Sequence, residues 1–426
     1  MQRRTAMCTT CGVVAPAERI GGGAQRCDHC RHRRSYERSR RLGLIWLALA
    51  LLGVVAWTVP IGEEIGPLWK VVRFYGVLAA VYPFAVLAHE LGHVIATVST
   101  GGCVHRLVLG SGAPILRMGR RGVLVVNSYP ASGATYLSSA GDRWWRIREA
   151  ISIAGGPAVD LAVLVGALVW SPEGSFPGTV RGTLILIAAS SLIAGLIPRE
   201  AAHPETGMPY GNDGMLLARL GRRCEATHKD AATSRAWLAL VDEDNERARR
   251  EAEAAIAAHP HSPAAQLVLA TAQILTDDAT LALPALRALA SAPTISGHDL
   301  AATLNNLAFA VVVAGDPTLL PEAEDASRRA LASLPTSSAT IGTRAQVLIE
   351  VGSLDEARPL VDIIGRRAQT PNERARWLAL ASIWNSAAGH ADAAEGVLAL
   401  AIDLDPDELL VGVARRTVRN RDSAVG

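Results

Sequence analysis

The stretch that decides the fold is residues 71–98, which read VVRFYGVLAAVYPFAVLAHELGHVIATV. It is apolar over enough residues to cross about 30 Å of hydrocarbon as a helix. His89, Glu90 and His93 lie near its end, in the spacing His-Glu-x-x-His. On a helix, histidines at i and i+4 share one face and can bind one metal ion, and the glutamate is placed as a general base. The stretch therefore predicts a zinc-dependent hydrolytic site at membrane depth, where ionisable groups are costly and functional by default.

The composition fits a membrane protein that also has soluble parts. Of the 426 residues, 50% are hydrophobic and 19% are charged, and the mean hydropathy of +0.22 is high for a wholly soluble chain. The length allows two or three domains. The formal net charge of +2 averages over very different segments, so it indicates no class of partner.

Four segments have the length and apolar composition of transmembrane helices: 42–59, 71–98, 151–170 and 182–197. Loop charge predicts their orientation, because arginine-rich loops stay cytoplasmic. Loops 61–70 and 171–180 have no arginine, whereas the connection between the second and third spans has Arg106, Arg117, Arg120, Arg121, Arg143, Arg146 and Arg148. We therefore expect a multi-pass protein of the cell (inner) membrane with both termini in the cytoplasm.

Two cysteine pairs lie near the N-terminus: Cys8 with Cys11, and Cys27 with Cys30. The pattern C-x₂-C…C-x₂-C is typical of a zinc ribbon. The first apolar run begins near Leu42, too late for a secretory signal, so we expect a reducing compartment in which thiolates bind metal. Residues 1–34 are predicted to hold one structural Zn²⁺ through these four cysteines. Such a ribbon can bind nucleic acid, bind protein or stabilise a terminus.

The segment between this ribbon and the first span is rich in arginine. Residues 35–69 are predicted to be a basic anchor followed by the first transmembrane span. The run from Arg31 to Arg41 suits contact with anionic lipid headgroups next to a membrane. Nucleic-acid binding is the other interpretation. No basic recognition helix accompanies the run, so we expect no nucleic-acid partner.

Residues 104–139 form an insert between the second and third spans. Short strands are predicted at 105–109, 115–118 and 123–128, with glycine-containing turns between them. One interpretation is a covered hairpin on the membrane surface. The other is an edge strand that pairs with an unwound segment of substrate by β-augmentation. Its position beside the metal motif favours the second.

The chain changes character from about Ala231, where alanine- and leucine-rich helical pairs begin. Prolines mark the helix pairs at intervals on the order of 35–40 residues, near the 34 of tetratricopeptide repeats: Pro260, Pro293, Pro335 and Pro406. We predict that residues 225–426 are an α-solenoid of this kind, which binds a cytoplasmic protein partner. The alternative is a helical domain that packs only on itself.

A zinc hydrolase needs a third protein ligand and an open coordination position. Asp213, in the run Asn212-Asp213-Gly214 after the fourth span, is the best candidate. A carboxylate suits zinc, and Gly214 allows the backbone to turn tightly beside the site.

Three motifs in this order resemble the site-2 protease family of intramembrane zinc metalloproteases. They are His89–His93, the run GGPAVD at 155–160, and Leu196-Ile197-Pro198 followed by residues 212–214. The resemblance covers residues 70–220. It implies that His89, His93 and Asp213 hold a catalytic Zn²⁺, that Glu90 is the general base, and that the insert is the family's membrane-associated β-hairpin.

The chain departs from the family pattern at two positions. Asp160 stands where the family usually has an asparagine that positions substrate or stabilises the oxyanion, and Gly195 lies about where another asparagine is often found. We include Asp160 among the catalytic candidates. A carboxylate donates a hydrogen bond only when protonated, so Asp160 could be kept neutral, bind the metal or weaken catalysis.

Together these features predict a mainly α fold: a polytopic membrane helix bundle with a β-hairpin insert, an N-terminal zinc ribbon and a C-terminal tetratricopeptide-like solenoid. The expected activity is hydrolysis of a peptide bond in or near a transmembrane segment of a membrane-protein substrate, in regulated proteolysis signalling. The alternative is a catalytically weakened, membrane-anchored adaptor that binds proteins through its ribbon and repeats.

Overall fold

A computed structural model describes most of the chain. The described residues are 5–16, 20–21, 26–27, 30, 41–53, 55, 67–118, 123–138, 144–171, 173, 175–202, 209–220, 231–276, 278–293, 295, 297–368 and 370–425. The predicted basic anchor at residues 31–40 and much of the first span after residue 53 lie outside them. The chain is mainly helical with small two-stranded sheets, as expected. It divides into two compact units, Met1–Arg31 with Arg235–Gly426, and His32–Ser234.

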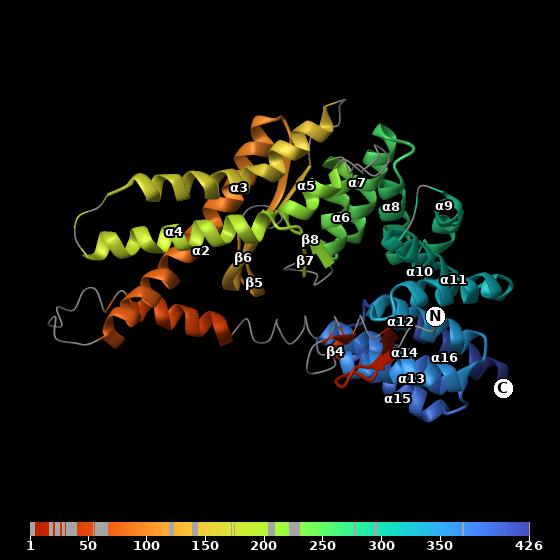
Figure 1. The fold of residues 1–426 in the computed structure, drawn as a ribbon. Coiled ribbons are helices and arrows are strands. Elements are labelled where there is room, and N and C mark those ends of the chain that lie inside the picture. Colours follow the sequence, from red (N-terminus) through yellow and green to blue (C-terminus); the bar gives the residue numbers. More distant parts are fainter. Residues whose placement is uncertain are drawn as a thin grey trace. The chain divides into compact units, whose positions relative to one another are not determined.

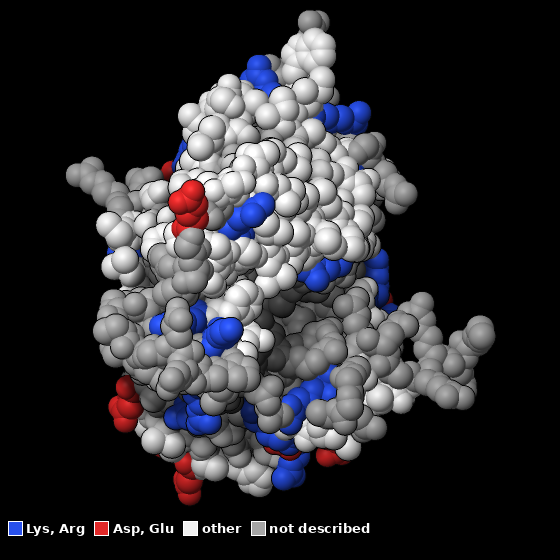
Figure 2. Space-filling model, turned by 60° about the vertical axis from the view of Figure 1, so that its left-hand side comes forward, with Lys and Arg blue, Asp and Glu red and all other residues white. Residues whose placement is uncertain are grey.

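Among the described residues of the second unit, three helices are long and apolar enough to cross a membrane. They are α2 (Pro67–Ser99), α3 (Trp145–Val169) and α4 (Ser175–Leu196), which pack on one another (Figure 1). Large apolar side chains cover their outer faces, among them Phe84, Ile95 and Val169. In Figure 2 the upper part of the molecule shows a broad surface with few charged side chains, most of them near its margins. Such a surface suits contact with lipid chains rather than water.

The observed helices differ at their ends from the predicted spans. Helix α3 begins at Trp145, before the predicted residue 151, and α4 begins at Ser175, before residue 182. Hydropathy locates the apolar part of a helix but not its ends. Helix α3 begins with a polar turn that contains Arg146 and Arg148, before its apolar part. The first predicted span is represented among the described residues by the shorter apolar helix Arg41–Gly53.

The insert after α2 is a hairpin of β5 (Cys103–Met118) and β6 (Leu124–Ser138). The predicted strands 105–109 and 115–118 both lie in β5, so the turn predicted between them was wrong. The predicted strand 123–128 matches the start of β6, but the chain stays extended to Ser138, which the sequence analysis missed. Residues 107–109 pair on both sides, with 133–135 and with 124–126, so the hairpin folds back on itself. Gly110, with φ +86°, lies where β5 bends. Val108, Val125 and Ala134 form the small core.

Helix α4 is followed by two short strands, β7 (Glu200–Ala202) and β8 (Pro209–Gly211), which pair antiparallel. The short helix α5 (Asp213–Leu220) begins directly after β8 and packs against α3 and α4. The turn into α5 therefore places Asp213 beside the membrane-length helices.

The C-terminal part of the chain, which we call the C-terminal helices, consists of helices that pack on their neighbours in sequence. They are α6 (Ala231–Val241), α7 (Asn245–Ala258), α8 (Pro263–Leu275), α9 (Ala279–Ser291), α10 (Gly297–Ala314), η3 (Pro317–Leu319), α11 (Leu320–Ser333), α12 (Ser338–Glu350), α13 (Leu354–Arg367), α14 (Pro371–Ala387), α15 (Ala391–Leu404) and α16 (Leu409–Val425).

The turns between these helices recur at a constant interval. Gly315, Gly352 and Gly389 each have positive φ, at +70°, +81° and +82°, and each ends a turn after α10, α12 or α14. Only glycine adopts this conformation at little cost. The interval between these residues lies within the predicted range of about 35–40 residues. The core between the helices is rich in alanine, which lets neighbouring helices approach closely.

The N-terminal module, by which we mean the described residues between 5 and 30, contains two antiparallel ladders. Strand β1 (Thr5–Met7) pairs with β2 (Val14–Pro16), and β3 (Ile20–Gly21) pairs with β4 (Arg26–Cys27). Cys8 and Cys11 lie in the turn after β1, where Gly12 has φ +77°. The module belongs to the same compact unit as the C-terminal helices.

Candidate metal centres

The structure brings His89, His93 and Asp213 together, and we call them the membrane cluster. The two histidines project from one face of α2, one helical turn apart, and Asp213 comes from the start of α5. Their Nε2 atoms are 3.2 Å apart. The Asp213 Oδ2 atom lies 3.3 Å from His89 Nε2 and 3.6 Å from His93 Nε2.

These distances fit a tetrahedral metal ion. Nitrogen and oxygen ligands of zinc lie about 2.0–2.2 Å from the ion, so the ligand atoms of a tetrahedron lie about 3.3–3.6 Å from one another. The three edges of the membrane cluster, 3.2, 3.3 and 3.6 Å, match that spacing. Three protein ligands of this kind leave one coordination position for water or substrate, as in catalytic zinc sites.

The second ring nitrogen of each histidine, Nδ1, makes a hydrogen bond that orients the ring. His89 Nδ1 lies 2.8 Å from Asp160 Oδ2, and His93 Nδ1 lies 2.9 Å from the Ser152 carbonyl oxygen. With Nδ1–H donating to oxygen, each Nε2 presents its lone pair to a metal. The Ser191 hydroxyl, from α4, donates to Asp160 Oδ2 at 2.7 Å. Asp160 and Ser191 therefore orient His89.

Glycines of α2 and α3 make room for the cluster. A Cβ atom on Gly156 would lie 2.4 Å from His93 Nε2 and 2.6 Å from His89 Nε2. On the same helices, a Cβ on Gly92 would lie 2.4 Å from the Gly155 carbonyl oxygen. Any larger residue would push the helices apart or displace the imidazoles. The run GGPAVD at 155–160 thus serves close helix contact as well as ligand placement.

The Glu90 side chain contacts the hairpin. Its side chain is buried, and the Thr135 hydroxyl of β6 donates to its Oε2 atom at 2.7 Å. A Cβ atom on Gly133 would lie 2.4 Å from Glu90 Oε1. A glycine at this position of β6 therefore leaves the space that the carboxylate occupies. Glu90 lies next to the membrane cluster but is not one of its three members.

Asp213 is held in place by its neighbours in the chain. The Asn212 amide donates to the carbonyl oxygens of Ala194 and Ile197, and Asn212 Oδ1 accepts from the backbone N–H of Met215. A Cβ on Gly214 would lie 2.1 Å from the Leu196 carbonyl oxygen, so only glycine fits there. A carboxylate that binds a metal does so in its ionised form.

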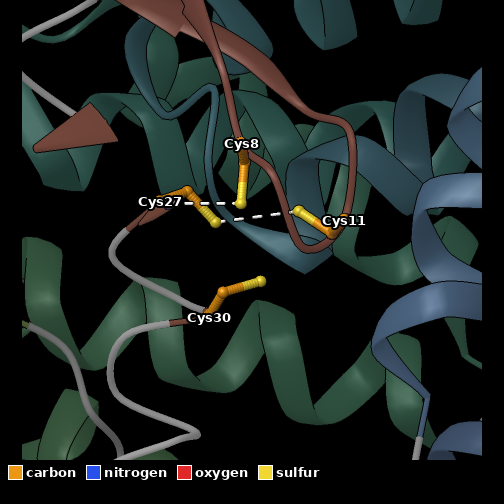
Figure 3. Close-up of side chains that lie close together, drawn as sticks. All are labelled: Cys8, Cys11, Cys27 and Cys30. Atoms are coloured by element: carbon orange, nitrogen blue, oxygen red, sulfur yellow. Dashed lines mark hydrogen bonds between the residues drawn. The ribbon is translucent and has the colours of Figure 1, made fainter. Parts of the chain in front are cut away.

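A second candidate centre is the four-cysteine cluster of Cys8, Cys11, Cys27 and Cys30 (Figure 3). The four side chains are buried and converge from the turn after β1 and from the end of β4. The four sulfur atoms all lie within 4.8 Å of one another, and the Sγ atoms of Cys11 and Cys27 are 3.8 Å apart. Tetrahedral zinc with sulfur ligands at about 2.3 Å has sulfur atoms about 3.8 Å apart. The geometry suits a closed metal site without an open position.

Backbone N–H groups favour the thiolate form of Cys8. The N–H of Cys27 donates to Cys8 Sγ at 3.3 Å. Burial raises the pKa of the Cys8 thiol, but hydrogen bonds from the backbone of Cys27, Cys11 and Thr10 outweigh burial and lower its pKa. A thiolate is the form that binds metal.

Every candidate site residue from the sequence lies at one of the two centres. Asp160 contacts His89 through a ring nitrogen and is not one of the three residues that converge on a metal position. A Cβ on Gly195 would lie 3.9 Å from Asp213 Oδ2, so this position also borders the membrane cluster. The sequence analysis missed Ser191, Thr135 and Ser152. An isolated serine or threonine carries no pattern, so no sequence signal identified them.

No protein-family profile and no curated protein matches the chain.

Proposed function

We propose that this protein is an intramembrane zinc metalloprotease of the site-2 protease type. The observation that carries the proposal is the membrane cluster, whose ligand atoms have tetrahedral spacing at the end of a membrane-length helix. Beside it lies a buried glutamate, Glu90. A metal with three protein ligands, an open position and an adjacent carboxylate is the arrangement of a hydrolytic zinc site.

In this mechanism His89, His93 and Asp213 would hold the zinc ion, which would supply Lewis-acid activation of water and of the scissile carbonyl group. Glu90 accepts the proton of the attacking water and delivers it to the leaving amine. The Thr135 hydroxyl keeps the Glu90 carboxylate in one orientation through its hydrogen bond to Oε2. Asp160, with Ser191, holds the His89 ring so that Nε2 faces the metal.

The substrate is a membrane protein that is cut in or near a transmembrane segment. A helical substrate hides its carbonyl groups in its own hydrogen bonds, so it must unwind before hydrolysis. The β5–β6 hairpin supports this proposal, because β6 contacts Glu90 through Thr135 and borders it at Gly133. A substrate segment in extended conformation could pair with this hairpin by β-augmentation.

The rest of the chain serves this activity in regulated proteolysis. We assign the protein to the cell (inner) membrane as a multi-pass protein with cytoplasmic termini and an arginine-rich anchor on anionic lipid. The four-cysteine cluster holds a structural Zn²⁺. The C-terminal helices form a tetratricopeptide-like solenoid that binds a cytoplasmic protein, a proposal supported by the constant interval of Gly315, Gly352 and Gly389.

Metal content separates this proposal from the adaptor hypothesis. Full-length protein purified in detergent is expected to hold about two zinc ions by elemental analysis, one for each cluster. Asp213→Ala loses one ion, and replacement of the four cysteines by serine loses the other. A single ion that is lost only with the cysteines would overturn the protease proposal and favour a membrane-anchored adaptor.

Cleavage tests the assignment of the base. Single-span model proteins with glycine and proline in their transmembrane segments are incubated with the enzyme in detergent, and new termini are detected by mass spectrometry. Glu90→Gln is expected to abolish cleavage while both zinc ions stay bound. The matched control is Glu173→Gln, in the exposed loop between α3 and α4. Turnover retained by Glu90→Gln would refute the role of Glu90.

A further inference from the structure

The N-terminal module contacts α13 of the C-terminal helices through two adjacent arginines. The Arg366 Nε–H donates to the carbonyl oxygen of Cys11 at 2.9 Å. The Arg367 guanidinium donates to Cys27 Sγ at 3.4 Å. Both contacts join residues more than three hundred positions apart in sequence. The guanidinium groups therefore meet the four-cysteine cluster directly, one at its backbone and one at a ligand sulfur.

Arg367 is buried, and hydrogen bonds from both of its terminal nitrogen atoms hold its guanidinium group. Only 3% of its surface is exposed. Its NH1 group donates to the Thr336 carbonyl oxygen and to Ser338 Oγ, both at 3.1 Å, which leaves NH2 directed at Cys27. A guanidinium held this way is already oriented before the module binds, so little side-chain entropy is lost in the contact.

Apolar side chains also pack across the contact between the N-terminal module and the C-terminal helices. The four cysteines form one buried cluster with Val13, Ala15 and Ile20 of the module and with Ile341, Ile363 and Ile364 of α12 and α13. Leu331, Leu360 and Trp377 pack against it. The face of α12 and α13 is therefore already covered by a segment of this chain.

Charge links the contact to the metal. Four thiolates around one Zn²⁺ leave a net negative charge in a buried place. Two guanidinium groups offset that charge. The observed arrangement therefore suits the metal-loaded cluster.

We propose that the N-terminal module is a metal-dependent internal ligand of the C-terminal helices, seated on α12 and α13 and coupled to its metal by Arg367. Arg367 is a positioning residue that holds a ligand sulfur from outside the metal shell. An external protein partner must then bind another face of the helices or displace the module. This proposal does not depend on proteolysis at the membrane cluster.

The first test needs no substitution at the interface. Amide hydrogen exchange is measured by mass spectrometry on the full chain in detergent, with and without a strong zinc chelator. An Asp213→Ala background leaves the four-cysteine cluster as the zinc site under study. We expect chelation to raise exchange at least about tenfold in residues 5–16 and in the apolar contact turns of α12 and α13. Peptides from α8 and α9, which contribute no residue to that apolar cluster, report on the rest of the unit.

Two outcomes would overturn the proposal. Faster exchange in residues 5–16 with no change in α12 and α13 would mean that the helices do not sense the metal. An equal rise in α8 and α9 would mean that the metal supports the whole unit rather than one docked surface.

A second test addresses Arg367. Arg367→Gln removes the charge but keeps a hydrogen-bond donor, and we expect zinc to leave for the chelator about 10–100 times faster. Arg367→Lys should restore part of the loss. The matched control is Arg358→Gln, at an exposed position of the same helix, where release should equal that of the parent. Equal release from Arg367→Gln and the parent would refute the coupling.

Discussion

His89 donates from Nδ1 to Asp160 Oδ2 across 2.8 Å, and the same carboxylate oxygen accepts from the Ser191 hydroxyl. A carboxylate behind a metal-binding histidine fixes the ring, sets its tautomer and makes it a stronger ligand. Asp160 thus makes one hydrogen bond to the His89 imidazole, and the hydrogen bond from Ser191 holds the carboxylate in that orientation. This geometry favours ligand orientation over a direct role at the substrate oxyanion, which would need a hydrogen-bond donor.

Substitution of Asp160 should weaken metal binding at the membrane cluster. Asp160→Asn can still accept from His89 but loses the negative charge, so we expect zinc affinity to fall about tenfold, and about 100-fold for Asp160→Ala. Competition with a fluorescent zinc chelator, in a background with the four cysteines replaced, measures this affinity. Glu173→Gln serves as the control. Unchanged affinity in Asp160→Ala would remove Asp160 from the support of the site.

Gly156 and Gly166 lie on the same helix and provide a matched pair. A Cβ on Gly156 would meet both imidazoles, whereas nothing lies within 4 Å of a Cβ on Gly166. We expect Gly156→Ala to lose the zinc ion of the membrane cluster and to keep that of the four-cysteine cluster. Gly166→Ala should retain both. Elemental analysis of each variant checks this, and full metal content in Gly156→Ala would contradict it.

Thr135 should affect turnover without affecting metal content. Thr135→Val removes the hydroxyl that donates to Glu90 Oε2 but keeps the shape of the side chain. We expect kcat to fall about 10–100-fold with little change in KM, because misplacement of a catalytic group lowers the rate more than binding. Thr135→Ser keeps the hydroxyl and should recover most of the rate. Equal loss in both variants would indicate a packing role only.

The ion pair between α9 and α11 predicts a dependence of stability on pH. Arg287 contacts Glu322 at 2.6 Å, with both side chains partly exposed, so we expect it to contribute about 0.2–1 kcal/mol. The hydrogen bond from Arg287 lowers the pKa of Glu322, although burial opposes this. Because the pKa of Glu322 is lower in the folded state, the stabilising contribution of the ion pair is complete above the unfolded-state pKa of about 4.3. It is lost as pH falls through the folded-state pKa.

Thermal unfolding of wild type and Glu322→Gln tests this dependence. The difference between their midpoints should be constant from about pH 7 to 5 and shrink below about pH 4. Glu395→Gln, at an exposed position of α15, is the control. A difference that grows on acidification would contradict the assignment.

Local patterns predicted the parts of the site that lie on one element. The i, i+4 spacing of His89 and His93 follows from the helical period, and the two cysteine pairs follow from turn geometry. Asp213 became a candidate only together with the other motifs of the resemblance, because an Asp-Gly pair alone marks an ordinary turn. The main helices were predictable from hydropathy, although their ends were not, because hydropathy does not report where a helix continues into a polar environment.

The contacts that complete each centre arise only from tertiary packing. Ser191 reaches Asp160 because α4 packs on α3, and Thr135 reaches Glu90 because β6 packs on α2. Neither residue has a period or spacing that relates it to its partner. The contact of Arg367 with Cys27 joins opposite ends of the chain. No local rule in a single sequence could relate these two residues.

In the membrane location that we propose, that contact between opposite ends constrains how often the chain crosses the bilayer. Met1–Arg31 and Arg235–Gly426 form one folded body, and one folded body must stay on one side of a membrane. The chain between them must therefore cross an even number of times. Three described helices have the length to cross, so a chain that uses all three needs one more crossing. Helix Arg41–Gly53, whose Trp46 indole donates to the Ala79 carbonyl oxygen of α2 at 2.8 Å, is placed to begin it.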